Sequence, residues 1–168
     1  AQLKQITGNW GRFEPVKATA RGAAPTVDFV FRNGRKVEFE AQPVDVARLL
    51  ADVKEYLESN PGKLDWQRTR VDEIGYRLVE QNETKYLGKT VAQWQLDLKP
   101  AADHFDRRIT VTAPMKTPGA YLVTGRLDDG NVSRIILWIA DTILVEKKLA
   151  QQGYYFVCDA ATGAPVAK

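Results

Sequence analysis

The second half of the chain alternates apolar and polar residues over a series of short segments, and this pattern constrains the fold more than any other feature. From Lys89 onward the segments are TVAQWQLDLKP, RRITVTAP, GAYLVTGRL, VSRIILWIA, TILVEKKL and GYYFVCDA. Alternation with a period of two residues places apolar side chains on one face of a strand. Short strands at regular spacing, separated by turns, are typical of two packed sheets. The sequence therefore predicts a mainly β protein folded as an antiparallel β-sandwich.

The segments 26–31 and 36–41 alternate in the same way, and Arg32-Asn33-Gly34-Arg35 lies between them. Asn-Gly between two alternating runs is a typical hairpin signal. A three-residue loop would set Phe29 opposite Val37, so that the apolar residues of both strands share one face. Gly34 would then take the left-handed conformation that closes such a loop. We therefore expect a β-hairpin over residues 26–41 and a buried Phe29.

A second hairpin signal, Asp128-Asp129-Gly130, lies between the segments 119–127 and 132–140. We expect these two segments to pair around it. The run Ile135–Ile139 is apolar at every position, which is typical of a central strand that is covered on both faces.

One segment has the periodicity of a helix. Between residues 45 and 59 the apolar residues recur at helical spacing, at Val46, Leu49, Leu50, Val53 and Leu57. Asp45 is suited to cap the start of this helix, and Asn60-Pro61-Gly62 is suited to end it. The sequence therefore predicts a helical insertion around residues 45–60. Residues 63–88 have no clear period, and we expect a short helix or turn there, followed by irregular chain.

The charge and the composition exclude several partners. The 168 residues are 44% hydrophobic and 27% charged, as in ordinary soluble globular chains. The net charge of +3 is spread along the chain without a basic block, so we expect no nucleic-acid partner. No stretch reaches the roughly 18 apolar residues that a membrane-spanning helix needs.

Few residues could carry chemistry. His104, the single histidine, lies beside Asp103 and Asp106 in a segment that we expect to be a loop, which is a weak metal signal. A Ser-His-Asp triad would have to use His104, and no serine lies in a nucleophile-elbow pattern. Cys158, the single cysteine, lies in an apolar strand and is expected to be buried rather than reactive. We therefore predict no catalytic, metal-binding or cofactor-binding residues, no cofactor, and no enzyme activity.

The remaining candidates are acidic pairs and tryptophans. Asp72-Glu73 and Asp128-Asp129 lie in expected turns, where nothing in the sequence brings two carboxylates together. Among the four tryptophans, Trp94 and Trp138 lie in strand patterns and are expected in the core. Trp10 and Trp66 are less constrained, and side by side on the surface they would favour a glycan-binding role.

The later segments resemble a known family. Residues 118–148, PGAYLVTGRLDDGNVSRIILWIADTILVEKK, and residues 154–168, YYFVCDAATGAPVAK, are similar to macroglobulin-type domains of bacterial alpha-2-macroglobulin-like proteins. In that family a Pro-Gly-x-Tyr-x-Val strand precedes a strand that ends in aspartate, here Asp141. A Val-x-Asp-x-x-Thr-Gly-x-Pro-Val-Ala segment, here residues 157–167, then opens the next domain. VDFVFRN at 27–33 and WQLDL at 94–98 also fit. The thioester motif Cys-x-Glu-Gln is absent, because Asp159-Ala160-Ala161 follows Cys158.

The resemblance implies a macroglobulin, immunoglobulin-like or fibronectin-III-like sandwich over residues 1–148, with a helical insertion at about 44–88. Residues 149–168 would start the following macroglobulin domain or form a C-terminal extension. Residues after about Tyr154 are then expected to pack poorly within this chain or to pair with the edge of a neighbouring molecule.

The function that the resemblance implies is that of a scaffold. The chain would be a structural domain fragment of a secreted or periplasmic protease-trapping inhibitor. Its partners would be the neighbouring domains of a larger parent chain, and proteases would be the targets of that parent. The alternative is a binding or adhesion module of a surface or secreted protein that recognises a glycan or a protein.

Overall fold

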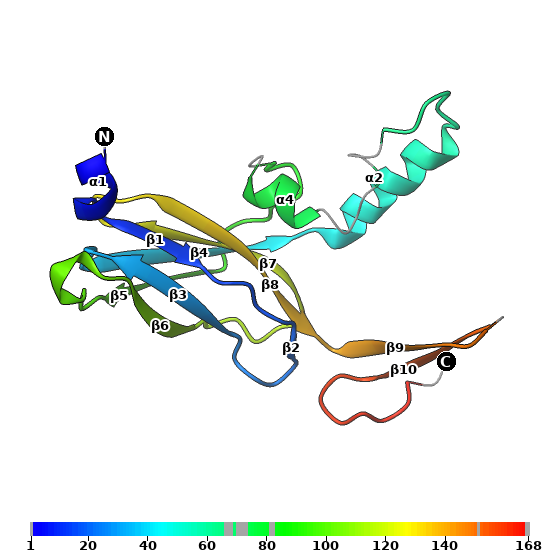
Figure 1. Ribbon diagram of the computed structural model, residues 1–168. Helices are drawn as coiled ribbons and strands as arrows, with labels where there is room; N and C mark the ends of the chain where they lie inside the picture. The colour runs from blue at the N-terminus through cyan, green and yellow to red at the C-terminus, as the bar shows by residue number, and fades with distance from the viewer. Residues whose placement is uncertain (1, 66–68, 70–73, 81–82, 151, 167–168) are drawn as a thin grey trace.

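Two facing sheets form the body of the protein, and a separate hairpin extends from one end (Figure 1). The computed structural model describes residues 2–65, 69, 74–80, 83–150 and 152–166. In chain order the elements are α1 (Gln2–Thr7), β1 (Trp10–Phe13), β2 (Thr19–Ala20), β3 (Thr26–Arg32), β4 (Lys36–Val44), α2 (Val46–Glu58), α4 (Ile74–Val79), β5 (Ala92–Asp97), the 3-10 helix η2 (Ala102–His104), β6 (Arg107–Thr112), β7 (Gly119–Leu127), β8 (Val132–Ala140), β9 (Thr142–Lys148) and β10 (Gly153–Asp159).

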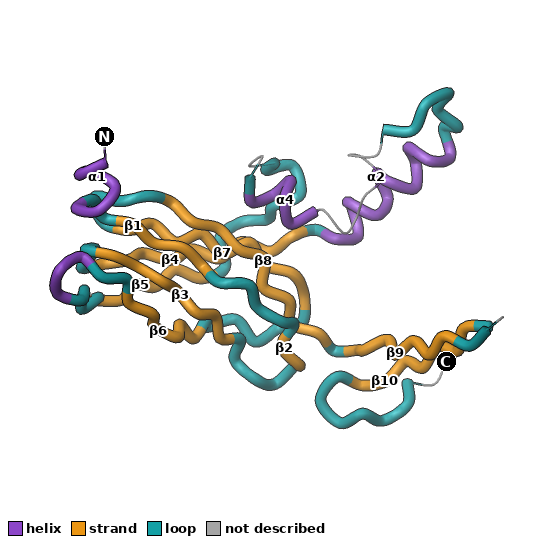
Figure 2. Tube along the Cα trace, viewed as in Figure 1, coloured by secondary structure: helices purple, strands orange, loops and turns teal. Residues whose placement is uncertain are grey.

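The described strands form three sheets. The small sheet has the order β1-β3-β6, the large sheet has the order β2-β8-β7-β4-β5, and β9 pairs with β10 alone. All pairings are antiparallel except that of β2 with β8. Strands dominate the tube in Figure 2, and the two larger sheets lie one over the other. The prediction of a mainly β, antiparallel sandwich is confirmed.

The space between the small and large sheets is filled by apolar side chains, with an aromatic group at its centre. Phe13 of β1 and Phe29 of β3 lie against Phe39 of β4, and Phe39 stacks on Trp94 of β5; the ring centroids are 5.2 to 5.8 Å apart. Burial of such large rings dominates the energy of a core. The buried core residues are Phe13, Val27, Phe29, Phe31, Val37, Phe39, Ala41, Leu98, Val111, Ala113, Met115, Tyr121, Val123, Leu127, Leu137 and Ile139.

The predicted hairpin over residues 26–41 is wrong. β3 pairs with β1 and β6, whereas β4 pairs with β5 and β7, so the chain crosses from one sheet to the other at residues 32–35. The apolar pattern is the same in both arrangements, because each strand turns its apolar face to the same core. Asn33, with φ 61°, takes the left-handed conformation instead of Gly34. Gly34 is needed for space, since a Cβ there would lie 2.5 Å from the Leu127 side chain.

The second predicted hairpin is confirmed. β7 and β8 pair from Gly119 opposite Ile139 to Arg126 opposite Val132, and the 128–130 turn joins them. β8 lies between β7 and β2, with Ile135 against the sandwich core and Ile136 against a second apolar cluster on the outer face. Not all of β8 is covered on both faces. Trp138, which we expected in the core, points outward and is 42% exposed.

The helical insertion packs on the outer face of the large sheet. α2 begins where predicted, and the Asp45 carboxylate accepts a hydrogen bond from the Arg48 N–H at 2.9 Å. Leu49 of α2 and Leu78 of α4 join Tyr86 and Leu122 in the second apolar cluster. The Tyr86 hydroxyl also donates to the Asp52 carboxylate at 2.8 Å. The short helix expected within residues 63–88 is found as α4; residues 66–68, 70–73 and 81–82 of that segment lie outside the described residues.

Asn131 joins the two sheets along one side. Its side chain reproduces the hydrogen bonds of a strand partner: the amide nitrogen donates to the Gly11 carbonyl at 2.8 Å, and the amide oxygen accepts from the Gly11 N–H at 2.8 Å. The Ser133 hydroxyl accepts from the Phe13 N–H at 3.1 Å. These bonds connect β1 of the small sheet to the start of β8, so the side chains close a gap that no ladder spans.

Candidate functional site

The most exposed apolar surface among the described residues is that of the β9–β10 hairpin. Its strands pair only with each other among the described strands, and Figure 1 shows them extending away from the sandwich, at the end opposite α1. Seven of its apolar side chains are between 41% and 63% exposed: Ile143, Leu144, Val145, Tyr154, Tyr155, Phe156 and Val157. Soluble monomers rarely expose such continuous apolar patches, and a hairpin alone is marginally stable. The hairpin is therefore a candidate packing interface.

The two faces of the hairpin differ. Directly opposed residues share a face, so Ile143 lies with Cys158, and Val145 lies with Phe156. The other face carries Leu144 opposite Val157, and Tyr155 opposite Glu146, to which the Tyr155 hydroxyl donates at 3.2 Å. The first of these faces is the more apolar.

The packing of residues after Tyr154 matches the expectation in part. Residues 154–157 are exposed, as expected of a segment that packs poorly within this chain. Cys158 is only 7% exposed, so the prediction that it is buried is confirmed.

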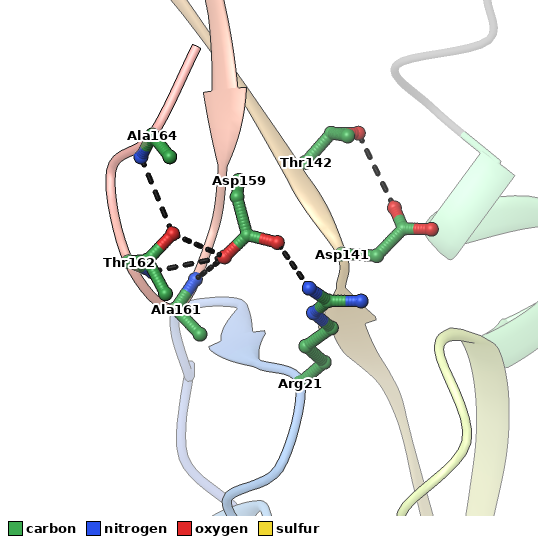
Figure 3. Close-up of polar contacts among 7 residues, drawn as sticks. All are labelled: Arg21, Asp141, Thr142, Asp159, Ala161, Thr162 and Ala164. Carbon is green, nitrogen blue, oxygen red and sulfur yellow. Dashed lines mark hydrogen bonds and ion pairs between the residues drawn. The ribbon is translucent and has the colours of Figure 1, made fainter. Parts of the chain in front are cut away.

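A tight turn follows β10, and Asp159 holds it together (Figure 3). Its Oδ1 accepts hydrogen bonds from the N–H groups of Ala161 and Thr162 and from the Thr162 hydroxyl, at 2.9 to 3.0 Å. The Thr162 N–H, together with the other donors and Arg21, lowers the pKa of the Asp159 carboxyl. Gly163, with φ 73°, completes the turn, and its N–H donates to the Asp159 carbonyl at 2.9 Å.

The residues after the turn begin a third strand beside β10. The Asp159 N–H donates to the Ala164 carbonyl at 2.8 Å, and the Val166 N–H donates to the Val157 carbonyl at 3.0 Å. Pro165 lies between these bonds, where no N–H is required. Thr162 and Gly163 thus form a turn that reverses the chain after β10. The spacing Asp-x-x-Thr-Gly-x-Pro has a physical reason: Asp159 and Thr162 close the turn, and glycine supplies the positive φ.

Arg21 connects this turn to the sandwich. Arg21 follows β2, and its guanidinium forms an ion pair with Asp159. The backbone N–H of Arg21 donates to the Ala140 carbonyl at 2.8 Å. The Ala160 N–H donates to the Asp141 carbonyl, also at 2.8 Å. Both contacts lie where β8 passes into β9, so the turn after β10 is held against the junction between the sandwich and the hairpin. Nothing in the sequence pattern pointed to Arg21.

His104 and Asp106 make contacts that join separate parts of the chain. The Asn33 side-chain nitrogen donates to the carbonyls of Ile6 and Gly8 at 2.9 Å, so its oxygen is left to accept from His104 Nδ1 at 2.7 Å. Asp106 pairs with Arg32 at 2.7 Å. These contacts fasten α1 and η2 to the crossing between β3 and β4. Among the described residues, no three His, Cys, Asp or Glu side chains gather as metal ligands would.

The tryptophans are placed differently from one another. Trp94 packs against the core on Phe39, and its buried indole N–H has no hydrogen-bond partner among the described residues. Trp10 is half-buried, and the guanidinium groups of Arg12 and Arg32 lie 5.7 and 5.9 Å from the centre of its ring. Trp66 and the Asp72-Glu73 pair lie outside the described residues, so a paired Trp10–Trp66 platform stays a prediction.

Comparison with known proteins defines the fold class. No protein-family model and no curated protein matches the sequence. The structure is similar to native alpha-2-macroglobulin from Escherichia coli. A crystal structure spanning its domains MG0-NIE-MG1 matches with a TM-score of 0.59 and 12% identity, over 95% of this chain and 48% of that one. A crystal structure spanning NIE-MG1 matches with a TM-score of 0.54 and 13% identity, over 95% and 74%.

A cryo-EM reconstruction of the native conformation of the E. coli protein matches with a TM-score of 0.50 and 13% identity, over 95% of this chain and 10% of that one. The chain thus spans about half the length of the first matched structure. The fold is of the macroglobulin type, as the sequence resemblance implied. Among the described residues, no helix combines the length and apolar character needed to cross a membrane.

Proposed function

We propose that this chain is a scaffold segment of a bacterial alpha-2-macroglobulin-like protein that traps proteases, and that it has no catalytic activity of its own. The exposed apolar hairpin β9–β10 is the observation that carries this proposal. A surface of this kind needs a covering partner. In a chain of consecutive β domains, the neighbouring domain supplies that cover.

The hairpin is proposed to be the first part of the following macroglobulin domain. The boundary expected from the sequence, after residue 148, falls between two strands that pair with each other. The pairing favours a boundary at Ala140–Asp141 instead, where the large sheet ends and the hairpin begins. The likeness over 74% of a segment that spans two named domains supports a division into one domain and the start of a second.

The work of such a segment is mechanical. The closed core between the two sheets resists deformation, because interiors packed at the density of crystals transmit strain rather than absorb it. The sandwich would hold its neighbours at fixed angles while cleavage elsewhere in the parent lets the whole protein close on a protease. We place the parent outside the cytoplasm, in the periplasm or the extracellular space, on the basis of the resemblance.

The natural gene product tests this proposal. It should be longer than this chain, and native gels should show that a protease changes its conformation and stays associated with it. The 168-residue chain alone should leave protease activity unchanged. Hydrogen exchange should be fast in the β9–β10 amides of the isolated chain and slow in the natural product. A natural product in which these amides stay unprotected, and which is unaltered by proteases, would contradict the proposal.

A further inference from the structure

We propose that Arg21 and Asp159 form a latch that fixes the orientation of the β9–β10 hairpin relative to the sandwich. This inference concerns the chain itself and is independent of what the parent protein does.

The connection between the two parts is short and has few ties. β8 ends at Ala140 and β9 begins at Thr142, so Asp141 alone lies between them. No described strand of the sandwich pairs with β9 or β10. A single backbone connection leaves the dihedral angles at Asp141 free to reorient the hairpin. A defined orientation therefore requires contacts on either side of this residue.

Arg21 is placed beside this connection by its own backbone. Ala20 is opposite Ala140 in the parallel pairing of β2 with β8, and the Arg21 N–H donates to the Ala140 carbonyl at 2.8 Å. The α-carbon of Arg21 therefore belongs to the sandwich. Its guanidinium reaches the Asp159 carboxylate, as Figure 3 shows.

Asp159 is a rigid partner because its carboxylate has a second task. Oδ1 accepts the three hydrogen bonds that close the 159–163 turn, and Oδ2 receives Arg21. The side chain is only 16% exposed, whereas that of Arg21 is 52% exposed. The flexible partner thus comes from the sandwich, and the fixed partner comes from the hairpin unit.

A backbone contact reinforces the same junction. The Ala160 N–H donates to the Asp141 carbonyl at 2.8 Å, and the Asp141 carboxylate accepts from the Thr142 hydroxyl at 3.2 Å. The first bond holds the turn to the residue before β9, and neither bond reaches a strand of the sandwich. Among the polar side chains drawn in Figure 3, Arg21 alone makes that connection.

The experiment measures orientation, because exposed ion pairs contribute little to unfolding energy. Residual dipolar couplings of backbone amides are recorded for the complete chain in a weakly aligning medium. In the wild type, one alignment tensor should fit the couplings of β7 and β8 together with those of β9 and β10. In Arg21→Gln, the hairpin couplings should shrink relative to those of the sandwich and should no longer fit that tensor.

Matched variants separate the latch from the turn. Asp159→Asn keeps an oxygen that can accept the turn bonds but loses the charge, and it should reproduce Arg21→Gln. The double variant should show no loss beyond that of either single variant, since both remove the same contact. Thr162→Val weakens the turn and leaves the ion pair in place, so its hairpin couplings should stay on the wild-type tensor.

The result that overturns the proposal is an Arg21→Gln chain whose hairpin still fits the wild-type tensor. A Thr162→Val chain that loses orientation as completely as Arg21→Gln also overturns it, because the turn would then hold the hairpin. Should Asp159→Asn disrupt the turn, seen as displaced Thr162 and Gly163 resonances, Arg21→Gln still decides the question, since Arg21 makes none of the Oδ1 bonds that close the turn. These outcomes do not bear on protease trapping by the parent.

Discussion

Phe29 and Phe39 face each other from opposite sheets, with ring centroids 5.8 Å apart and planes at 86°. They are 1% and 2% exposed, respectively. The two residues are ten positions apart in the sequence, and the chain crosses from one sheet to the other between them. Their edge-to-face contact therefore links the two sheets close to this crossing.

Replacing Phe29 with alanine should destabilise the protein by about 3–5 kcal/mol, because the change removes a buried ring and leaves a cavity between the sheets. Urea denaturation followed by fluorescence measures this loss. Phe105→Ala is the matched control, since Phe105 is 67% exposed and its removal should change stability little. A loss of less than about 1 kcal/mol in Phe29→Ala would contradict the core described above.

Gly34→Ala should destabilise the protein by about 1–3 kcal/mol through overpacking, since the new methyl group would meet the Leu127 side chain. Gly62 provides the comparison, because a Cβ there has no atom within 4 Å. Gly62→Ala should therefore leave the melting temperature close to that of the wild type. Equal melting temperatures for the two variants would show that a methyl group at position 34 fits beside Leu127 without strain.

Asn131→Ala should cost about 1–3 kcal/mol, because it leaves the buried N–H and C=O groups of Gly11 without partners. Ser133→Ala removes one acceptor and should cost less. Thermal unfolding of both variants measures the difference. If the melting temperature of Asn131→Ala equalled that of the wild type, the side-chain connection between β1 and β8 would not contribute to stability.

The Asp159 turn should depend on pH in a defined direction. Its pKa is lowered in the folded protein, so the stabilisation is present above the ordinary aspartate pKa and is lost as the pH falls through the lower, folded value. The Thr162 amide resonance should therefore titrate with a midpoint below about 3.9. Asp159→Asn should abolish that transition. A midpoint at or above the ordinary value would contradict the contacts assigned to this carboxylate.

Phe156→Lys should reduce self-association of the isolated chain and leave the melting temperature of the sandwich unchanged, since Phe156 is 48% exposed on the more apolar face of the hairpin. Light scattering and binding of a hydrophobic dye measure the first effect. Leu144→Lys makes the same change on the opposite face. Unchanged dye binding in both variants would show that the hairpin is not the apolar surface available to partners.

The sequence was sufficient to predict what depends on local pattern. The strands from β3 to β10, the capped helix after Asp45, the β7–β8 turn and the burial of Phe29 follow from side-chain periodicity and turn chemistry, whereas the short strands β1 and β2 do not. The pairing of β3 and β4 did not follow, because alternation fixes which face is apolar and not which strand lies alongside. Arg21 and Asp159 are 138 residues apart, and no periodic signal links an arginine in a loop to one carboxylate so distant.

The crossing between β3 and β4 also determines when the domain can be completed. β4 joins β7, whose residues follow it by more than 70 positions, with Val44 opposite Ala120 as the nearest pair. Local zipping of neighbouring strands cannot build this sheet, and contacts of such long range slow folding. Until β7 has been synthesised, β4 therefore lacks one of its two partner strands, and we expect the complete sandwich to form only after that point.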